Sequence, residues 1–298
     1  MSDKMKIPII TGATSSGKSA VVYRFLEERP EYEFISADAF QVYRGLNIGT
    51  AKPDPAILKR FPHHLVNILE PGESYSAGRF VEHAEQAIAK IIGNGKKPIV
   101  AGGTGLYIES LRNGLFNEPS IDPLMRKALL TLPKEELYAE LSQVDPESAV
   151  KINSNDKIRL VRALEVWKSL GIPLSAARKL FKGEARFKYN VYILDKQRDI
   201  LYRDINGRCE KMLQAGWLEE VKCLLSLGVA PDAPAFRAIG YRELAAVAAN
   251  QMTIDMAKEL ISQKTRNFAK RQLTWFRRMK DTLVLSADGI LKHLAAGG

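Results

Sequence analysis

Apolar residues follow two different periods in the first hundred positions of this chain. Short apolar runs, typical of buried strands, lie at 7–10, 33–36, 65–69 and 98–101. Two segments between these runs, 19–28 and 76–92, have apolar residues at helical spacing instead. Because strands that alternate with helices form parallel sheets covered on both faces, this part of the chain predicts a doubly wound α/β fold.

The pattern changes near residue 118, where strand signals disappear. The later elements are short helices separated by prolines within 122–181, a strand at 189–194, and long helical segments at 201–227 and 253–280. We interpret the chain as a parallel-sheet core that is interrupted by a helical insertion domain. The predicted boundaries are 1–117 for the first part of the core, 118–186 for the insertion and 187–298 for the second part.

The sequence GATSSGKS at 12–19 follows the first predicted strand and precedes the first predicted helix. It satisfies the pattern G-x-x-x-x-G-K-[ST], in which backbone N–H groups and a helix N-terminus converge on a polyphosphate. Lys18 adds a positive charge, and the Ser19 hydroxyl is placed to bind Mg²⁺. An ordinary glycine turn is the alternative. The predicted phosphate-binding residues are Gly12, Ala13, Thr14, Ser15, Ser16, Gly17, Lys18 and Ser19.

Two further polar residues directly follow predicted strands. Asp38 comes after the strand at 33–36, and Thr104 lies among three glycines after the strand at 98–101. Since ligands bind at the carboxyl ends of parallel strands, we expect both residues beside the phosphate loop. There Asp38 could hold Mg²⁺ through water or act as a general base. The alternatives are a helix N-cap at Asp38 and a plain strand-to-helix turn at Thr104.

The charge balance indicates a polyanionic partner, and nucleic acid is the first candidate. The chain has 44 Lys and Arg against 34 Asp and Glu, a formal net charge of +10. A soluble basic protein without such a partner is the alternative. Cys209 and Cys223 form no C-x-x-C pair, so we expect free thiols in a reducing cytoplasm. No segment reaches membrane-spanning length, and we expect no membrane contact.

Cationic residues are concentrated on helical segments. Segment 263–280 has seven Lys and Arg, no acidic residue and several interleaved aromatics, a pattern typical of RNA-binding surfaces. An amphipathic helix with buried aromatics has the same pattern, and we expect buried aromatics together with cations that face a nucleic acid. Arg203 and Arg208 can bind phosphate bidentately, and Arg159 and Arg162 flank an apolar line. Solvated helix faces are the alternative for all four.

Seven motifs extend over nearly the whole chain: GATSSGKS (12–19), SADAFQVYRGLNIGTAKP (36–53), HHLVNILEPGESYSAGRF (63–80), PIVAGGTGLY (98–107), DKIRLVRALEV (156–166), FRAIGYRE (236–243) and TRNFAKRQLTWFRR (265–278). In this order they resemble the tRNA dimethylallyltransferase family. The resemblance implies a P-loop kinase-like core with a helical insertion, Mg²⁺, dimethylallyl diphosphate and the anticodon stem-loop of tRNA. It implies transfer of a dimethylallyl group to N6 of adenosine 37, 3′ of the anticodon, in tRNAs that read codons starting with U. Diphosphate and N6-isopentenyladenosine would be the products.

The resemblance also implies roles for individual residues. The phosphate loop would hold the diphosphate rather than ATP, with Arg208 as a second cation. Asp38 resembles the general base for the adenine amine, and Thr104 resembles a hydroxyl near the transferred group. The residues that match tRNA-contacting segments of the family are Asp38, Ala39, Phe40, Gln41, Thr104, Arg126, Arg159, Leu160, Val161, Arg162, Ala163, Arg237, Ala238, Ile239, Gly240, Tyr241 and Arg242.

Four positions depart from the family's usual residues. Ala13 replaces proline, and Ser19 replaces threonine but keeps the hydroxyl. Ala39 replaces serine, which removes a hydroxyl contact. Asp204 replaces arginine, which predicts a lower affinity for diphosphate.

Three other functions are compatible with parts of this pattern. They are an isopentenyltransferase that acts on free adenine nucleotides, a small-molecule P-loop kinase, and a catalytically silent tRNA-binding protein. The helical insertion and the basic segment at 263–280 argue against the first of these. We expect a monomeric cytoplasmic protein.

Overall fold

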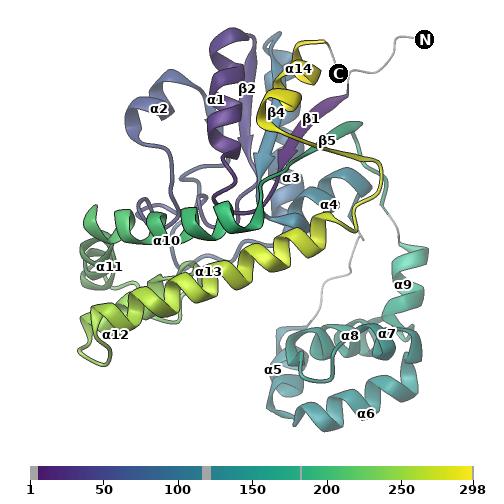
Figure 1. The fold of residues 1–298 in the computed structure, drawn as a ribbon. Coiled ribbons are helices and arrows are strands. Elements are labelled where there is room, and N and C mark those ends of the chain that lie inside the picture. Colours follow the sequence, from purple (N-terminus) through teal and green to yellow (C-terminus); the bar gives the residue numbers. More distant parts are fainter. Residues whose placement is uncertain (1–5, 116–121, 182, 297–298) are drawn as a thin grey trace, which may run out of the picture. The chain divides into compact units, whose positions relative to one another are not determined.

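The computed structural model describes residues 6–115, 122–181 and 183–296. The chain divides into two compact units (Figure 1). We call Met1–Arg112 together with Arg186–Gly298 the core unit, and Asn113–Ala185 the insertion unit. The sequence analysis places the start of the insertion at residue 118, which lies outside the described residues.

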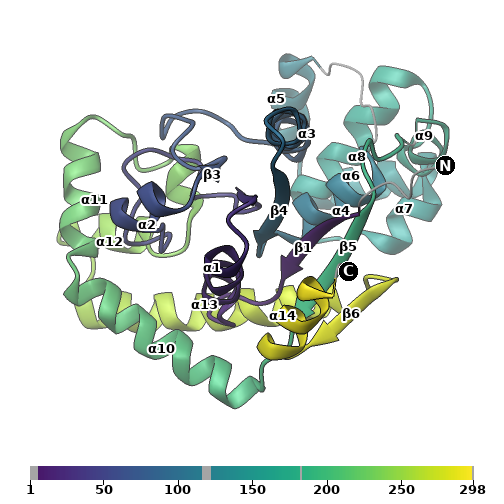
Figure 2. The same cartoon turned by 90° about the horizontal axis from the view of Figure 1, so that it is seen from above.

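The described part of the core unit contains a six-stranded parallel sheet in the order β3-β2-β4-β1-β5-β6 (Figures 1 and 2). Its strands are β1 (Ile7–Thr11), β2 (Tyr32–Ser36), β3 (His63–His64), β4 (Lys97–Gly102), β5 (Tyr189–Leu194) and β6 (Thr282–Leu285). In the centre, Ile9 of β1 is paired with Val100 and with Val191. Every residue of β1 is buried, as expected for a central parallel strand.

Helices cover both faces of the sheet (Figure 2). On one face, α1 (Lys18–Glu28) and α14 (Ala287–Ala295) contribute to one apolar cluster with Phe34 and Ile99. The other face carries α3 (Ala77–Gly93) and α4 (Gly105–Asn113). The Ser76 side chain accepts a hydrogen bond from the Arg79 amide at the start of α3, as expected for an N-cap.

Most of the remaining helices of the core unit form a second cluster. They are α10 (Arg198–Gln214), α11 (Trp217–Ser226), the 3-10 turn at Pro234–Arg237, α12 (Tyr241–Ala248) and α13 (Ile254–Phe276). Buried Leu46, Trp217 and Tyr241 lie at the centre of this cluster. The short helix α2 (Pro55–Arg60) is not part of this cluster, since its Ile57 packs against the cluster of α1 and α14. The long helices α10 and α13 lie side by side (Figures 1 and 2). No helix in the described residues is long and apolar enough to cross a lipid bilayer.

The structure corrects two expectations about elements and adds an edge strand. The strand predicted at 65–69 is wrong because Leu65 and Asn67 have φ angles of 64° and 55°, in the left-handed region that a strand excludes. The helix predicted over 201–227 is broken by Gly216, whose φ is 95°. The edge strand β6 was not predicted, since its apolar residues are partly exposed and lack a clear period.

The insertion unit is a small helical domain with its own apolar core. Its helices are α5 (Pro123–Thr131), α6 (Lys134–Val144), α7 (Pro146–Lys151), α8 (Lys157–Leu170) and α9 (Leu174–Leu180). Leu137 and Leu141 of α6 pack with Leu160 and Leu164 of α8, and all four side chains are fully buried. Burial of such side chains stabilises a fold by about 1.5–3 kcal/mol each.

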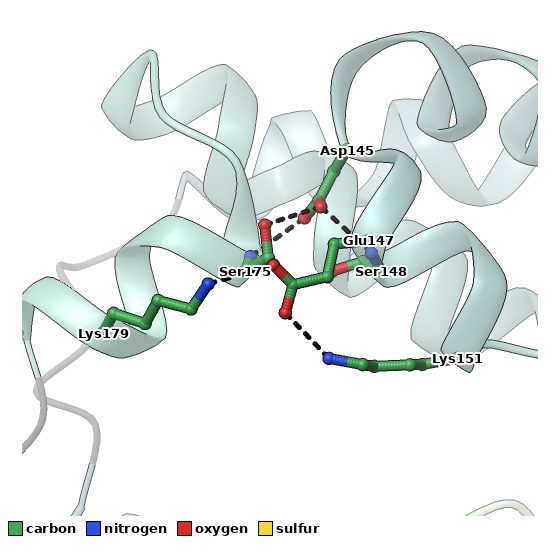
Figure 3. A network of polar contacts seen from close by, with 6 residues as sticks. All are labelled: Asp145, Glu147, Ser148, Lys151, Ser175 and Lys179. Carbon is green, nitrogen blue, oxygen red and sulfur yellow. Dashed lines mark hydrogen bonds and ion pairs between the residues drawn. The ribbon is translucent and has the colours of Figure 1, made fainter.

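Figure 3 shows the polar network that joins α7 to α9. The buried carboxylate of Asp145 accepts hydrogen bonds from the Ser148 amide, the Ser175 amide and the Ser175 hydroxyl. These bonds lower the pKa of Asp145, although its burial acts in the opposite direction. Glu147 contacts Lys151 and Lys179 on the surface. Asp145 therefore caps α7 and fixes the start of α9 at the same time.

Candidate active site

The phosphate loop has the strand–loop–helix geometry that the sequence predicts. Gly12 and Gly17 adopt φ angles of 151° and 100°, which favour glycine. The ammonium of Lys18 donates to the carbonyl oxygens of Gly12 and Ala13, at 2.9 Å and 2.7 Å. Since the first N–H groups of α1 have no partner within the helix, the loop offers backbone donors and a cation to a polyphosphate.

Two side chains from distant segments hold the phosphate loop from outside. The Thr14 amide donates to Gln272 Oε1 at 2.8 Å, and Gln272 Nε2 donates to the Gly103 carbonyl at 2.7 Å. Lys196 Nζ donates to the Ser15 carbonyl at 2.9 Å. Buried Gln272 of α13 thus connects the loop after β1 to the loop after β4.

The sequence predicts a role in the site for neither of these residues. Gln272 lies in the basic segment that is predicted to bind RNA, and its only signal of a buried contact is the apolar character of Phe268, Ala269 and Phe276 at helical spacing from it. Lys196 lies two residues after β5, at the edge of the sheet where the strands end. That position was a usable signal, since the carboxyl ends of parallel strands share one edge.

Asp38 and Thr104 meet at the same edge of the sheet. Asp38 Oδ1 accepts from the amides of Phe40 and Gln41, at 2.9 Å and 3.2 Å, so Asp38 caps a turn and not the helix that was the alternative. The Ala39 amide donates to Thr104 Oγ1 at 3.1 Å. This close approach needs Gly102, because a Cβ there would lie 2.1 Å from the Ala37 carbonyl oxygen.

Electrostatic interactions join the phosphate loop to Asp38 and Arg208. Burial and, to a lesser extent, the Arg208 guanidinium lower the pKa of Lys18 to about 7, whereas Asp38 acts in the opposite direction. Burial also lowers the pKa of Arg208, again opposed by Asp38. Two partly desolvated cations and one carboxylate therefore share a small region, which favours binding of an anion.

The residues of this region fit Mg²⁺ bound mainly through a substrate. The described residues contain no group of three His, Cys, Asp or Glu side chains that could enclose a metal ion. Mg²⁺ usually takes only one or two protein ligands and completes its shell with phosphates and water. The Ser19 hydroxyl at the start of α1 and the Asp38 carboxylate suit that mode. The Ser15 and Ser16 hydroxyls, buried without a hydrogen-bond partner among the described residues, are further groups that a ligand would satisfy.

The predicted tRNA-contacting residues at 237–242 are of two kinds. Arg237 and Arg242 are exposed, and Ile239 is half-buried. Ala238 and Tyr241 belong to the apolar cluster around Trp217. Gly240 is buried with φ 101°, and a Cβ there would lie 2.1 Å from the Trp217 ring. Only the two arginines of this motif present charged side chains to solvent.

The predicted tRNA-contacting residues of the insertion unit also divide into exposed arginines and buried apolar residues. Arg159 is exposed, whereas the side chains of Leu160, Val161 and Ala163 are fully buried in the core of the unit. Arg126 and Arg162 each lie 3.3 Å from Glu165 Oε2. Because the Glu165 side chain is wholly buried, it holds both guanidinium groups in place at the surface of the unit.

The basic segment at 263–280 begins within α13 and extends past its last residue, Phe276, so Arg277 and Arg278 follow the helix. Phe276 is buried, and Phe268, Leu273 and Trp275 are half-buried, so the aromatic residues serve mainly as packing. Lys264 forms an ion pair with Glu243. Within the described residues, Lys270, Arg271, Arg277 and Arg278 are exposed and have no ion-pair partner. These four cations remain the predicted phosphate contacts.

Comparison with known proteins then places this arrangement in a family. A family model described as IPP transferase matches residues 41–279. The chain belongs to the IPP transferase family. It is 45% identical to tRNA dimethylallyltransferase 1 of Citrifermentans bemidjiense, over 98% of this chain and 96% of the relative. It is 44% identical to the tRNA dimethylallyltransferase of Geobacter sulfurreducens, over 92% of this chain and 90% of that relative.

Solved structures agree with this family assignment. The tRNA isopentenylpyrophosphate transferase of Bacillus halodurans superposes with a TM-score of 0.72 at 31% identity, over 99% of this chain and 97% of that chain. A eukaryotic dimethylallyltransferase acting on tRNA superposes with a TM-score of 0.81 at 27% identity, over 95% of this chain and 74% of that chain. The predicted resemblance and the predicted P-loop α/β fold are both confirmed.

Proposed function

We propose that this protein transfers a dimethylallyl group from dimethylallyl diphosphate to N6 of adenosine 37 in tRNAs that read codons starting with U. The coarser statement, that the chain is a dimethylallyltransferase acting on tRNA, is confirmed by its relatives and its family. The diphosphate donor, the anticodon-loop nucleoside and Mg²⁺ are our proposals. A monomeric state and a cytoplasmic location also stay predictions.

One observation supports dimethylallyl diphosphate as the donor of the transferred group: Lys18, Arg208 and Asp38 interact electrostatically beside the phosphate loop. When the allylic C–O bond breaks, its electron pair goes to the departing diphosphate, where negative charge builds up. Groups preset to stabilise this charge are usually the largest contribution to catalysis. The loop amides, Lys18 and Arg208 are such groups, and Mg²⁺, when bound, neutralises further charge on the phosphates.

Asp38 is suited to the acceptor half of the reaction. The lone pair of the adenine amine is delocalised into the ring, so N6 becomes a good nucleophile only as it loses a proton. Asp38 accepting that proton would raise the rate by about 10²–10⁴-fold. The base must first leave the anticodon-loop stack, which costs a few kcal/mol. The Thr104 hydroxyl, which accepts a hydrogen bond from the amide of neighbouring Ala39, would contact the reacting groups.

A transfer assay with purified protein tests this proposal. Radiolabelled dimethylallyl diphosphate is supplied with one of three acceptors: an unmodified tRNA transcript that reads a codon starting with U, the same transcript with guanosine at position 37, or AMP. We expect label on the first transcript only, without any requirement for ATP. Labelling of AMP alone would favour the free-nucleotide enzyme, and hydrolysis of ATP onto an acceptor without prenyl transfer would favour a kinase.

A further inference from the structure

Ser15 has the backbone conformation in the phosphate loop that most needs support. Its φ of 61° lies in the left-handed region, which is unfavourable for a residue with a side chain. The peptide group between Ser15 and Ser16 is held at both ends. Lys196 Nζ donates to its carbonyl at 2.9 Å, and its N–H donates to the Ala13 carbonyl at 3.2 Å. Lys196 therefore helps to fix this peptide group from outside the loop.

Lys196 is itself held by Asp204. The Lys196 ammonium lies 2.5 Å from Asp204 Oδ2 in α10, and both side chains are less than half exposed. In the described residues Asp204 forms no other ion pair. The bond to Lys196 and the ammonium charge lower the pKa of Asp204, so the carboxylate stays charged at neutral pH.

We propose that Lys196 and Asp204 are a positioning pair for the phosphate loop. Asp204 fixes the ammonium of Lys196, and the ammonium fixes the Ser15–Ser16 peptide group, so that the loop amides are oriented before the ligand arrives. The choice of diphosphate as ligand rests on the proposed function. Under this proposal Asp204 strengthens diphosphate binding, whereas the sequence predicts that it weakens it. Its carboxylate is negatively charged like the ligand, but it acts by holding Lys196.

Asp204→Asn separates positioning from simple electrostatics. The substitution removes one negative charge near the loop, so if Asp204 acted only through its charge, the binding of inorganic diphosphate would tighten. A positioning role weakens it, because a neutral amide holds the ammonium less firmly than the carboxylate does. By isothermal titration we expect the Kd to rise about threefold for Asp204→Asn and about tenfold for Lys196→Met, which loses a charged hydrogen-bond donor.

A matched control is available on the same helix. Glu210 of α10 pairs with Lys258 at 3.0 Å, away from the loop, so Glu210→Gln makes the same charge change without touching the phosphate site. We expect it to bind diphosphate as the wild type does. Lys196→Arg, which keeps a charge and donors, should retain most of the affinity. In transfer assays, Lys196→Met should lower kcat while the KM for tRNA stays unchanged.

Coupling between the two residues completes the test. If Asp204 acts through Lys196, then Asp204→Asn has no further effect in the Lys196→Met background. Hydrogen–deuterium exchange of the loop amides should be faster in both single variants. Tighter diphosphate binding by Asp204→Asn, or unchanged binding and exchange in Lys196→Met, would overturn the positioning role. A wild-type protein that neither binds diphosphate nor transfers the dimethylallyl group would overturn the proposed function instead, and loop exchange would still test the pair.

Discussion

Asp38 combines two tasks that can be separated by substitution. One carboxylate oxygen accepts the amides of Phe40 and Gln41 and so shapes the turn after β2. The general-base role needs a group that can take a proton. An asparagine amide oxygen can accept the two backbone hydrogen bonds, but it cannot act as a base at neutral pH.

We therefore expect Asp38→Asn to fold normally and to bind tRNA nearly as the wild type does. Its turnover should fall by about 10²–10⁴-fold, because proton removal from the adenine amine is lost. Single-turnover transfer and tRNA binding, measured on the same preparation, check this expectation. Turnover within a factor of about two of the wild type would remove Asp38 from the base role.

The lowered pKa of Lys18 predicts how the affinity for diphosphate depends on pH. Burial and Arg208 lower the pKa of Lys18 to about 7 in the free protein, so its charge is lost as the pH rises above that value. A bound anion favours the charged form, so binding above pH 7 requires uptake of a proton. The affinity should fall by up to about tenfold per pH unit above 7.

Lys18→Arg is the control for this titration, because an arginine stays charged throughout the range. The ratio of wild-type to Lys18→Arg affinity removes the titration of the ligand itself. Isothermal titration in buffers of different ionisation enthalpy measures the proton uptake directly. A ratio that stays constant from pH 6.5 to 8.5 would show that Lys18 does not titrate there.

Helix α13 is the element that ties the site together. Its buried Gln272 accepts from the loop after β1 and donates to the loop after β4, while its exposed side carries unpaired cations in the described part of the chain. The insertion unit follows the same division on α8, where Leu160 and Val161 fill the core and Glu165 holds two arginines at the surface. Each of these two helices therefore has packing residues on its buried side and cations on or near its exposed side.

Replacing Gln272 by leucine should damage stability and activity together. The Thr14 amide and the Gly103 carbonyl would lose their partners, and an unpaired buried polar group costs about 1–3 kcal/mol. We expect the free energy of unfolding in urea to fall by an amount in that range. Gln263→Leu, an exposed position on the same helix, should leave both properties unchanged. Equal stability of the two variants would contradict the bridging role of Gln272.

The molecule as a whole has a net charge of +10, and part of this charge is concentrated in the exposed cations of the basic segment 263–280. If these side chains contact tRNA phosphates, binding releases counterions and the affinity falls steeply with salt. A plot of log K against log salt concentration then has a negative slope, and each lost phosphate contact should make that slope shallower by about 0.7–0.9.

The double substitution Arg277→Ala and Arg278→Ala should therefore weaken tRNA binding and flatten its salt dependence. Lys59→Ala with Lys90→Ala makes the same change in net charge at exposed positions outside the basic segment 263–280. We expect that control to have a much smaller effect on the slope. Filter binding at several salt concentrations measures both, and identical slopes for the two double variants would place the tRNA contact elsewhere.

The sequence by itself determined the features that depend on neighbouring residues. A buried run, a glycine loop and a helical period define the phosphate site locally, and parallel strands bring Asp38 and Thr104 to the same edge of the sheet. The local signal failed where backbone angles depend on packing, as at Leu65 and Asn67.

Only the tertiary structure decided which distant side chains support the site. Gln272 is 258 positions from Thr14, and Lys196 is 181 positions from Ser15. It also decided that Leu160 and Tyr241 belong to cores, whereas the arginines beside them face solvent. The physical reason is that the packing of the folded chain sets which side chains are buried and which groups form hydrogen bonds. The spacing of apolar residues along a short segment carries no information about partners so far away in the sequence.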